Sequence, residues 1–287
     1  SGKTTLILES LIPGLSAAIE GKKPPEHVLT VSAPGIRQVK LIDATPIGIN
    51  VRSTVATYAG VHDELRKISA GLPQAKEKGY KAGDFSYNTG SLRCPTCDGT
   101  GQISLDVQFL PDVDIPCPDC RGSRYGKEAE AVLYPAPDGK GYSLPQLMAM
   151  DVRQAMEVCS GMKLVRGRLQ VLDSLGLGYL TLGEQTPSLS GGEAQRLKLA
   201  SEMGRPQSDA VFIFDEPTIG LHPLDVRTLL AVFETLIRSG ATVIVIEHDL
   251  DLIRNADYIV DMGPGGGEEG GRIVAAGTPE EVQAAKE

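Results

Sequence analysis

The segment Ala210-Val-Phe-Ile-Phe-Asp-Glu-Pro217 decides the fold class that this sequence predicts. Its five consecutive apolar residues are typical of a strand that is buried on both faces, as in a parallel sheet. A second apolar run, residues 242–246, ends in Glu247 and His248. Because the carboxyl ends of parallel strands meet at one edge of a sheet, the charged residues after both runs should face one ligand. We therefore expect an α/β fold with a parallel-sheet core.

The acidic pair after the first strand indicates chemistry on a phosphate. Asp215 at the tip of a buried strand can reach a magnesium-bound phosphate, and Glu216 can orient or polarise an attacking water. His248 should lie at the same edge of the sheet. A lone histidine after a strand is usually structural, but its alignment with an Asp-Glu tip favours a functional role.

The first residues, Ser1-Gly-Lys-Thr-Thr5, resemble the end of a phosphate-binding loop, G-x-x-x-x-G-K-[ST]. In such a loop the backbone amides and the helix N-terminus hold the phosphates, Lys3 reaches the β and γ oxygens, and Thr4 ligates magnesium. The first glycine and the preceding strand are not in this sequence, so a chance tetrapeptide is the alternative. We expect the chain to begin inside this loop and to be a fragment whose sites need another half.

Ser190-Gly-Gly192 precedes a segment, 194–203, with helical spacing of its apolar residues. Ser190 can cap this helix while its hydroxyl and the amides of Gly191 and Gly192 face an anion. The alternative is an ordinary turn in which the serine is only a cap.

Four of the five cysteines form two pairs, Cys94-x2-Cys97 and Cys117-x2-Cys120, separated by nineteen residues. Two such turns can close a tetrahedral site of four thiolates, which suits a structural zinc ion. Two disulfides are one alternative, which a reducing compartment disfavours. A redox pair is the other, which two copies at this spacing disfavour. Cys159 is expected to be a small buried side chain.

Length and composition limit the class of protein. The chain has 287 residues, a net charge of −9 and 41% apolar residues, which fits one large or two modest globular domains. No run of 18 apolar residues and no secretory signal is present, so we expect no membrane span and a cytoplasmic location. Positive and negative charges balance over residues 1–150, but the stretch 52–81 within them is locally basic. Such a stretch is usually a solvated face, and the alternative is a face that contacts phosphates.

The other elements are expected from periodicity and turn residues. A helix that starts at Thr5 should end at Ile12, because Pro13 and Gly14 follow. Further helices are predicted at 58–71 and 223–239, with two or three short ones over 144–175. A strand is expected over 272–278.

The order of the four motifs, SGKT, LSGGE, an apolar run with DEP, and an apolar run with His, resembles that of the ABC ATPase superfamily. Within it, the chain resembles the C-terminal ATPase half of the UvrA family of excinuclease ABC proteins. The specific resemblance rests on the following segments: Ala56-Thr-Tyr58, Lys78-Gly-Tyr-Lys81, Phe109-Leu-Pro-Asp-Val113, Cys120-Arg-Gly-Ser-Arg-Tyr125, Leu189-Ser-Gly-Gly-Glu-Ala-Gln-Arg196, Asp215-Glu-Pro-Thr-Ile-Gly-Leu-His222, Ala256-Asp-Tyr258 and Gly277-Thr-Pro-Glu-Glu281.

The resemblance implies an ABC-type ATPase core with an inserted helical signature domain that carries the zinc module at 94–120. The start of the core would be 1–50, the insertion 51–188, and the signature helix with the rest of the core 189–287. In this family two ATPase halves sandwich ATP and magnesium between the phosphate loop of one and the LSGGE motif of the other. The implied catalytic residues are Glu216 and His248, and the implied nucleotide-site residues are Gly2, Lys3, Thr4, Thr5, Ser190, Gly191, Gly192, Asp215 and Asp225.

The resemblance also implies an ATP-driven sensor of damaged duplex DNA in nucleotide excision repair. Its partners would be the N-terminal ATPase half of the same protein, a second copy in a homodimer, and a helicase-like repair protein of the UvrB type. Recognition of many lesions favours phosphate contacts and shape over base contacts. The candidate DNA contacts are Arg52, Lys76, Lys78, Lys81, Arg93, Arg121 and Arg124.

Three positions depart from the family. Ala44 stands where the family has a Gln that couples metal and water to the inserted domain, and Ile49 and Asp84 stand where it usually has Arg. These departures favour a divergent paralogue, such as one that confers resistance to a DNA-binding drug. A zinc-stabilised DNA-binding module with a silent ATPase is a further alternative.

Overall fold

A computed structural model describes residues 2–48, 50–105, 113–203, 207–218, 223–265 and 270–285, with the backbone alone for 223–225. The chain divides into two compact units. Ser1–Thr45 and Met203–Glu287 form the first, which we call the sheet unit, and Pro46–Glu202 form the second, the helical unit. Among the described residues, none of the helices combines the length and apolar character needed to cross a membrane.

A three-stranded parallel sheet forms the core of the sheet unit, as the sequence predicts, with the strand order β1-β6-β7. The strands are β1 (Gln38–Ile42), β6 (Ala210–Asp215) and β7 (Thr242–Ile246). The central strand is buried from Ala210 to Phe214, because it has a neighbour on each side. In the register, Ile42 pairs with Phe214, and Asp215 pairs with Ile246. The residues that follow the three strands therefore leave the same edge.

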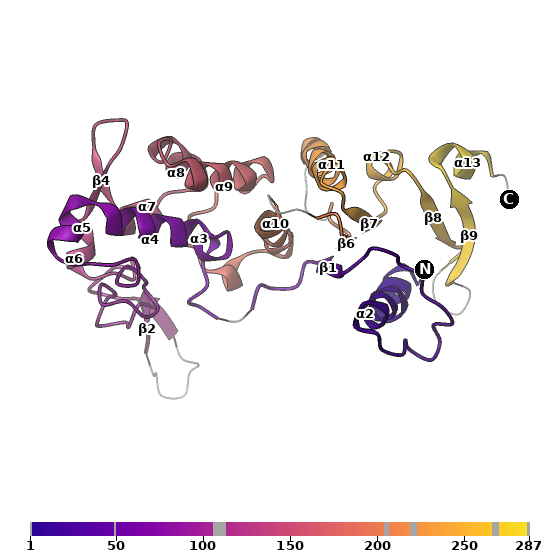
Figure 1. Cartoon of the computed structure of the whole chain (residues 1–287), viewed down its shortest axis with the longest axis horizontal. Helices are drawn as coiled ribbons and strands as arrows, with labels where there is room; N and C mark the ends of the chain where they lie inside the picture. Colours follow the sequence, from indigo (N-terminus) through magenta and orange to yellow (C-terminus); the bar gives the residue numbers. More distant parts are fainter. Residues whose placement is uncertain are drawn as a thin grey trace. The chain divides into compact units, whose positions relative to one another are not determined.

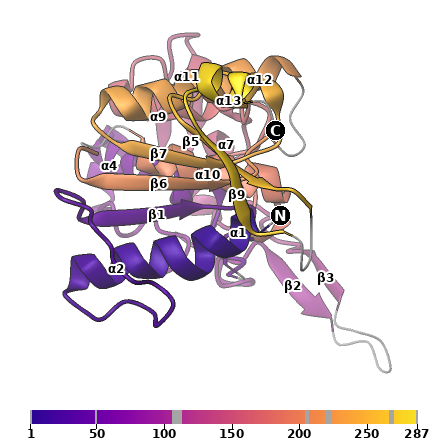
Figure 2. The same cartoon turned by 90° about the vertical axis from the view of Figure 1, so that its right-hand side faces the viewer.

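Helices and a second strand pair complete the sheet unit. In the view of Figure 2, β7, β6 and β1 lie in this order, with α11 beyond β7 and α2 beyond β1. The Phe233 ring of α11 packs on Phe214 at 4.6 Å between ring centroids, which ties this helix to the central strand. The remaining elements are α1 (Lys3–Thr5), the π-helical η1 (Leu6–Leu11), α2 (Ile12–Glu20), α11 (Pro223–Arg238), α12 (Leu250–Ile253), the antiparallel pair β8 (Ile259–Gly263) and β9 (Arg272–Gly277), and α13 (Pro279–Ala284).

The first helical segment corrects one expectation. It does not end at Ile12 but continues to Glu20, although Pro13 has no N–H to donate. The wider π-helical turn over η1 ends two residues before Pro13, and such a turn accommodates the missing hydrogen bond and the proline ring. The helix ends at Gly21, whose φ of 66° is left-handed, as is common after a helix.

Short helices and two antiparallel strand pairs, β2–β3 and β4–β5, build the described part of the helical unit. Helices α4 and α9 are in contact, and they run close together in Figure 1; Leu65 of α4 and Leu169 of α9 are fully buried. The elements are α3 (Val55–Tyr58), α4 (Val61–Gly71), α5 (Pro73–Glu77), β2 (Gln102–Leu105), β3 (Val113–Pro116), α6 (Lys127–Glu130), β4 (Leu133–Pro135), β5 (Gly141–Ser143), α7 (Leu144–Met148), α8 (Val152–Val158), α9 (Lys163–Ser174), the 3-10 turn η2 (Thr186–Ser188) and α10 (Gly191–Glu202).

Two boundaries in the helical unit differ from the expected ones. The helix expected over 58–71 begins only at Val61, because Gly60 adopts a left-handed φ of 71° between the end of α3 at Tyr58 and the start of α4. The unit itself extends to Glu202 and not to 188, since α10 packs on α3 and α9. The signature helix is therefore built into the helical unit.

Candidate nucleotide site and four-cysteine module

The N-terminal loop leads directly into a helix, as a phosphate-binding loop does. Gly2 has a φ of 79°, and a Cβ there would lie 3.2 Å from the Gly271 Cα. Glycine is therefore required both by the left-handed backbone and by the close approach of another chain segment. Lys3, Thr4 and Thr5 form α1, the first helical turn, with Thr5 exposed.

Three side chains that are distant in sequence meet at the carboxyl edge of the sheet. Lys3 Nζ lies 3.1 Å from His248 Nδ1, and His248 Nε2 lies 3.0 Å from Glu216 Oε1. The imidazole therefore bridges the lysine of α1 and the carboxyl group after β6. The two residues expected to be catalytic, Glu216 and His248, are thus in direct contact.

Asp215 lies beside the same loop. Its side chain has a hydrogen bond with Thr4, which brings together the side chain expected to ligate magnesium and the one expected to reach a magnesium-bound phosphate. Burial raises the pKa of Asp215, the nearby Glu216 and Asp43 carboxyl groups raise it further, and Thr4 acts in the opposite direction. A cation here would offset this crowding of acidic groups.

Asp43 was missed by the sequence reasoning. It follows β1 directly, and its charge acts on Asp215. Thr45 Oγ1 donates a hydrogen bond to its carboxyl group at 2.6 Å. The signal that could have identified it is the same one that identified Asp215: an acidic residue at the carboxyl end of a parallel strand.

Glu216 has a left-handed backbone with a φ of 47°. This conformation costs about 1 kcal/mol for a residue other than glycine, and such strain persists only where neighbouring contacts hold it. The Glu216 N–H donates to the Ile246 carbonyl at 2.9 Å. The backbone of Glu216, whose side chain contacts His248, is therefore hydrogen-bonded to the end of β7.

In the helical unit, Ser190 caps α10 as expected. The Glu193 N–H donates to Ser190 Oγ at 3.3 Å, and the Ser190 N–H donates to Glu193 Oε2 at 2.7 Å. This reciprocal pair is a capping box. Gly191 and Gly192 form the first turn of the helix, where free amides can bind an anion.

Tyr179 adds a contact that the sequence reasoning did not find. Its hydroxyl donates to Glu193 Oε1, so both oxygens of this carboxyl group are engaged. Burial acts to raise the pKa of Glu193, but the hydrogen bonds from Tyr179 and Ser190 outweigh it and hold the pKa below its ordinary value. The cap therefore weakens only as pH falls below the ordinary value of 4.5 and through the lowered one.

Several expected residues fall outside the described part of the chain. They are the side chain of Asp225, Ile49, residues 219–222 of the DEP segment and residues 109–112 of the segment between the cysteine pairs. Ala44, where the resemblance implies a Gln, is described and lies in the sheet unit two residues after β1.

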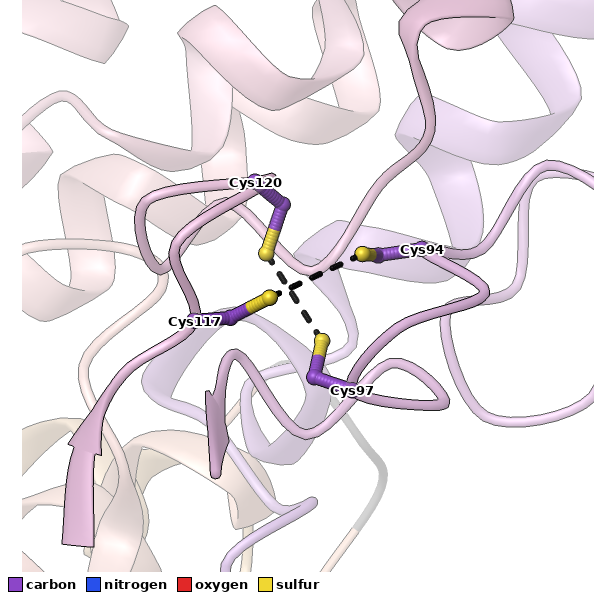
Figure 3. A group of neighbouring side chains, drawn as sticks. All are labelled: Cys94, Cys97, Cys117 and Cys120. Atoms are coloured by element: carbon purple, nitrogen blue, oxygen red, sulfur yellow. Dashed lines mark hydrogen bonds between the residues drawn. The ribbon is translucent and has the colours of Figure 1, made fainter.

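The four paired cysteines converge in the helical unit (Figure 3). Their sulfur atoms all lie within 4.8 Å of one another, with 3.9 Å between Cys94 and Cys117 and 3.6 Å between Cys97 and Cys120. No disulfide joins them. A tetrahedral zinc ion with Zn–S bonds of about 2.3 Å separates its sulfurs by about 3.8 Å, so the arrangement fits zinc.

The backbone around the cysteines also fits a metal-binding turn. The Gly101 N–H donates to Cys97 Sγ at 3.3 Å. At Gly99 φ is 78°, and a Cβ would lie only 1.7 Å from the Tyr87 carbonyl oxygen, so no other residue fits. Burial raises the pKa of the Cys120 thiol to about 12; a bound cation would favour the thiolate that metal binding requires. Cys159 is buried away from this group, as expected.

Six of the seven basic residues expected at DNA fall into two groups. Arg52 and Arg93 both pair with Asp98, at 3.2 and 2.8 Å, next to Cys97. Lys76, Lys78, Lys81 and Arg121 are exposed. The structure thus leaves the second group accessible to a phosphate backbone.

Arg124 does not fit the predicted phosphate contact. It is only 4% exposed, and both terminal nitrogens of its guanidinium group donate to the Val51 carbonyl at 3.2 Å. The same group lies over the Tyr87 ring, 5.0 Å from its centroid. Its charge is therefore used inside the unit, where it supports the fold around the cysteine module.

Known proteins match this chain over its whole length. No protein-family model matches it. UvrABC system protein A from Bacillus subtilis is 45% identical over 290 residues, which are 100% of this chain and 30% of that protein. Its counterpart from Thermus thermophilus is 42% identical over 285 residues, 98% of this chain and 29% of that protein. The crystal structure of UvrA2 from Deinococcus radiodurans matches with a TM-score of 0.85 at 40% identity, over 100% of this chain and 34% of that one.

The fold is that of an ABC-type ATPase domain with a parallel-sheet core and an inserted helical unit that carries a four-cysteine module. The chain belongs to the UvrA family. It spans about 30% of the length of the curated relatives that it matches.

Proposed function

We propose that this chain is the ATP-binding and hydrolysing part of a DNA-damage-recognition protein of nucleotide excision repair. The observation that carries the proposal is the contact series from Lys3 through His248 to Glu216. It joins the first turn of α1 to a carboxyl group at the edge of a parallel sheet. The names of the relatives, UvrABC system protein A, support the pathway.

The residues of the sheet unit suit ATP hydrolysis. The amides of α1 and the Lys3 ammonium would hold the β and γ phosphates. Glu216 would accept a proton from a water molecule as the water oxygen attacks the γ-phosphorus. The bond between the γ-phosphorus and the oxygen that bridges it to the β-phosphate would break, and ADP would leave. His248 holds the Glu216 carboxyl group in place. Thr4 and Asp215 would hold magnesium, which neutralises phosphate charge when it is bound.

The capped α10 would serve a second, opposing nucleotide site. In the proposed assembly, Ser190, Gly191 and Gly192 contact the nucleotide of the other ATPase half, and closure of the halves follows ATP binding. The partners would be the N-terminal half of the same protein, a second copy in a homodimer and a helicase-like repair protein. The cytoplasm would be the location, since the DNA is there.

ATP turnover by the full-length protein should respond to DNA if this proposal is correct. The inserted helical unit would transmit DNA contact to the nucleotide site, so damaged duplex should change the rate of phosphate release at saturating ATP. The measurement is steady-state ATPase activity over a titration of damaged and undamaged duplex, with single nucleotides as the control. A rate that stays constant at every duplex concentration would exclude coupling.

The exposed basic residues of the helical unit would contact the DNA backbone. Lys76, Lys78 and Lys81 lie within and just after α5. Asp84 reduces the positive charge there: it accepts the Lys81 N–H at 2.8 Å, and this bond together with one from Ser91 lowers its pKa. The three lysine side chains nevertheless remain exposed.

Changing Lys76, Lys78 and Lys81 together to alanine should weaken binding to all duplexes and reduce the dependence of log K on log salt by about 1 for each phosphate interaction that is removed. Equilibrium binding of duplex to the full-length protein at several salt concentrations measures this slope. A matched control changes Lys127, Lys140 and Lys163, which are exposed lysines of the same unit. Equal slopes for the two triple variants would show that 76–81 is only a solvated face.

A paralogue with altered coupling is the second candidate, and Ala44 favours it. The resemblance implies a Gln at this position that couples the metal and the attacking water to the inserted domain, and an alanine has no polar group for that role. Such a protein could act in resistance to a DNA-binding drug, or bind DNA through the zinc module with a silent ATPase. The DNA titration described above separates coupled from uncoupled turnover.

A further inference from the structure

We propose that Glu247 is a positioning residue, which holds the loop that carries Glu216 and the loop that carries His248 in one arrangement. The inference rests on the proposed ATPase function, and it assigns a role to a residue outside the expected site residues. Glu247 itself directly follows β7. Its side chain would act on the reaction only through its neighbours.

Both oxygens of the Glu247 side chain are used, each by a different loop. Oε1 accepts from the Thr218 N–H at 2.8 Å and from the Thr218 hydroxyl. Oε2 accepts from the His248 N–H at 2.7 Å and from the Asp249 N–H at 3.1 Å. Glu247 is 9% exposed, so little water competes for these bonds, and a buried group that loses them is costly.

The bonds surround the strained Glu216. Its left-handed backbone is held on one side by the bond from its N–H to Ile246. Two residues later, Thr218 is anchored on Glu247. The loop is therefore fixed both at and after Glu216, which limits the directions in which the Glu216 side chain can point.

The same carboxyl group fixes the start of the His248 loop. The backbone of His248 and that of Asp249 both donate to it. Asp249 then caps α12, since its Oδ1 accepts from the N–H groups of Asp251 and Leu252 at 2.9 and 3.0 Å. His248 thus lies between two anchored points, and this places its ring at 3.0 Å from Glu216.

Only a side chain that accepts hydrogen bonds at both of its terminal atoms satisfies this arrangement. A carboxylate accepts on both, whereas an amide presents one acceptor and one NH₂ donor. Glu247→Gln is nearly the same size, but its NH₂ would face the donors of one of the two loops. One loop would then shift away, and misplacement of a reacting group by about 1 Å can cost about 100-fold in rate.

The test is steady-state ATP hydrolysis by the full-length protein. Glu247→Gln should lower kcat by about 10-fold or more, with KM for ATP changed less than about 2-fold, since the phosphate-holding residues lie in α1. Thr218→Val, which removes only the hydroxyl donor, should lower kcat by about 3-fold. Because part of the effect of Glu247 passes through His248, adding Glu247→Gln to His248→Ala should cause a smaller loss of kcat than Glu247→Gln causes alone.

The matched control is Glu234→Gln, an exposed position on α11 that pairs with Arg238. Unchanged kcat in Glu247→Gln, or a loss that multiplies fully with that of His248→Ala, would overturn the proposal and leave Glu247 a purely structural residue. If Glu247→Gln does not fold, Thr218→Val decides: reduced kcat at an unchanged unfolding temperature supports the proposal, and unchanged kcat overturns it. Glu216→Gln is assayed in parallel, because its failure to lower turnover would instead reject the proposed ATPase.

Discussion

Replacing Cys117 by serine should remove one equivalent of zinc from each full-length chain and unfold the region around the four cysteines. Cys117 is fully buried, and its sulfur lies 3.9 Å from that of Cys94. A structural zinc ion contributes about 10 kcal/mol or more to the folding of a small module, and a serine hydroxyl is a much poorer ligand than a thiolate. Metal content and thermal unfolding, each with and without chelator, measure the two effects.

Cys159→Ala is the matched control for this experiment. Cys159 is also fully buried but lies outside the cluster, so the change should cost about 1 kcal/mol through packing and leave the zinc content unchanged. A Cys117→Ser protein with the wild-type zinc content and unfolding temperature would contradict a zinc module. Loss of zinc in both variants would mean that general unfolding caused it.

Replacing Glu216 by glutamine should lower kcat for ATP hydrolysis by about 100-fold or more and leave KM for ATP nearly unchanged. General-base catalysis contributes about 100- to 10,000-fold, and an amide cannot accept the proton of the attacking water. The affinity for ATP should persist, because Lys3 and Thr4 remain in α1. Phosphate release by the full-length protein and direct nucleotide binding give the two quantities.

Glu234→Gln makes the same chemical change on the surface of the same unit, and it should leave both quantities unchanged. If Glu216→Gln hydrolysed ATP at close to the wild-type rate, then either another group would be the base or the activity would come from another site. Tight ATP binding without turnover in the variant is the pattern that supports the assigned role.

The spacing of apolar residues and the positions of glycine and proline predicted the secondary structure well where packing agreed with them. The buried run 210–214 and the run 242–246 are parallel strands at the expected places. Pro13 misled the prediction because a π-helical turn before it let the helix continue. Gly60 was not recognised as a break, since a glycine inside an apolar periodicity can continue a helix or end it.

The sequence alone determined the family and the chemical identity of the groups. Four motifs in a particular order, and two CxxC pairs at a particular spacing, need no coordinates to be recognised, because both are properties of the linear chain. They predicted that Glu216 and His248 would share one site and that the four cysteines would share another. They also offered seven basic residues as equal candidates for DNA.

Tertiary structure alone decided how those groups are used. Of the seven basic candidates for DNA contact, Arg124 is buried, and Arg52 and Arg93 form ion pairs with Asp98. The structure also shows that Glu247 accepts hydrogen bonds from two loops. Hydrogen bonds, burial and strain depend on distances between residues far apart in the chain, and a single sequence does not contain those distances.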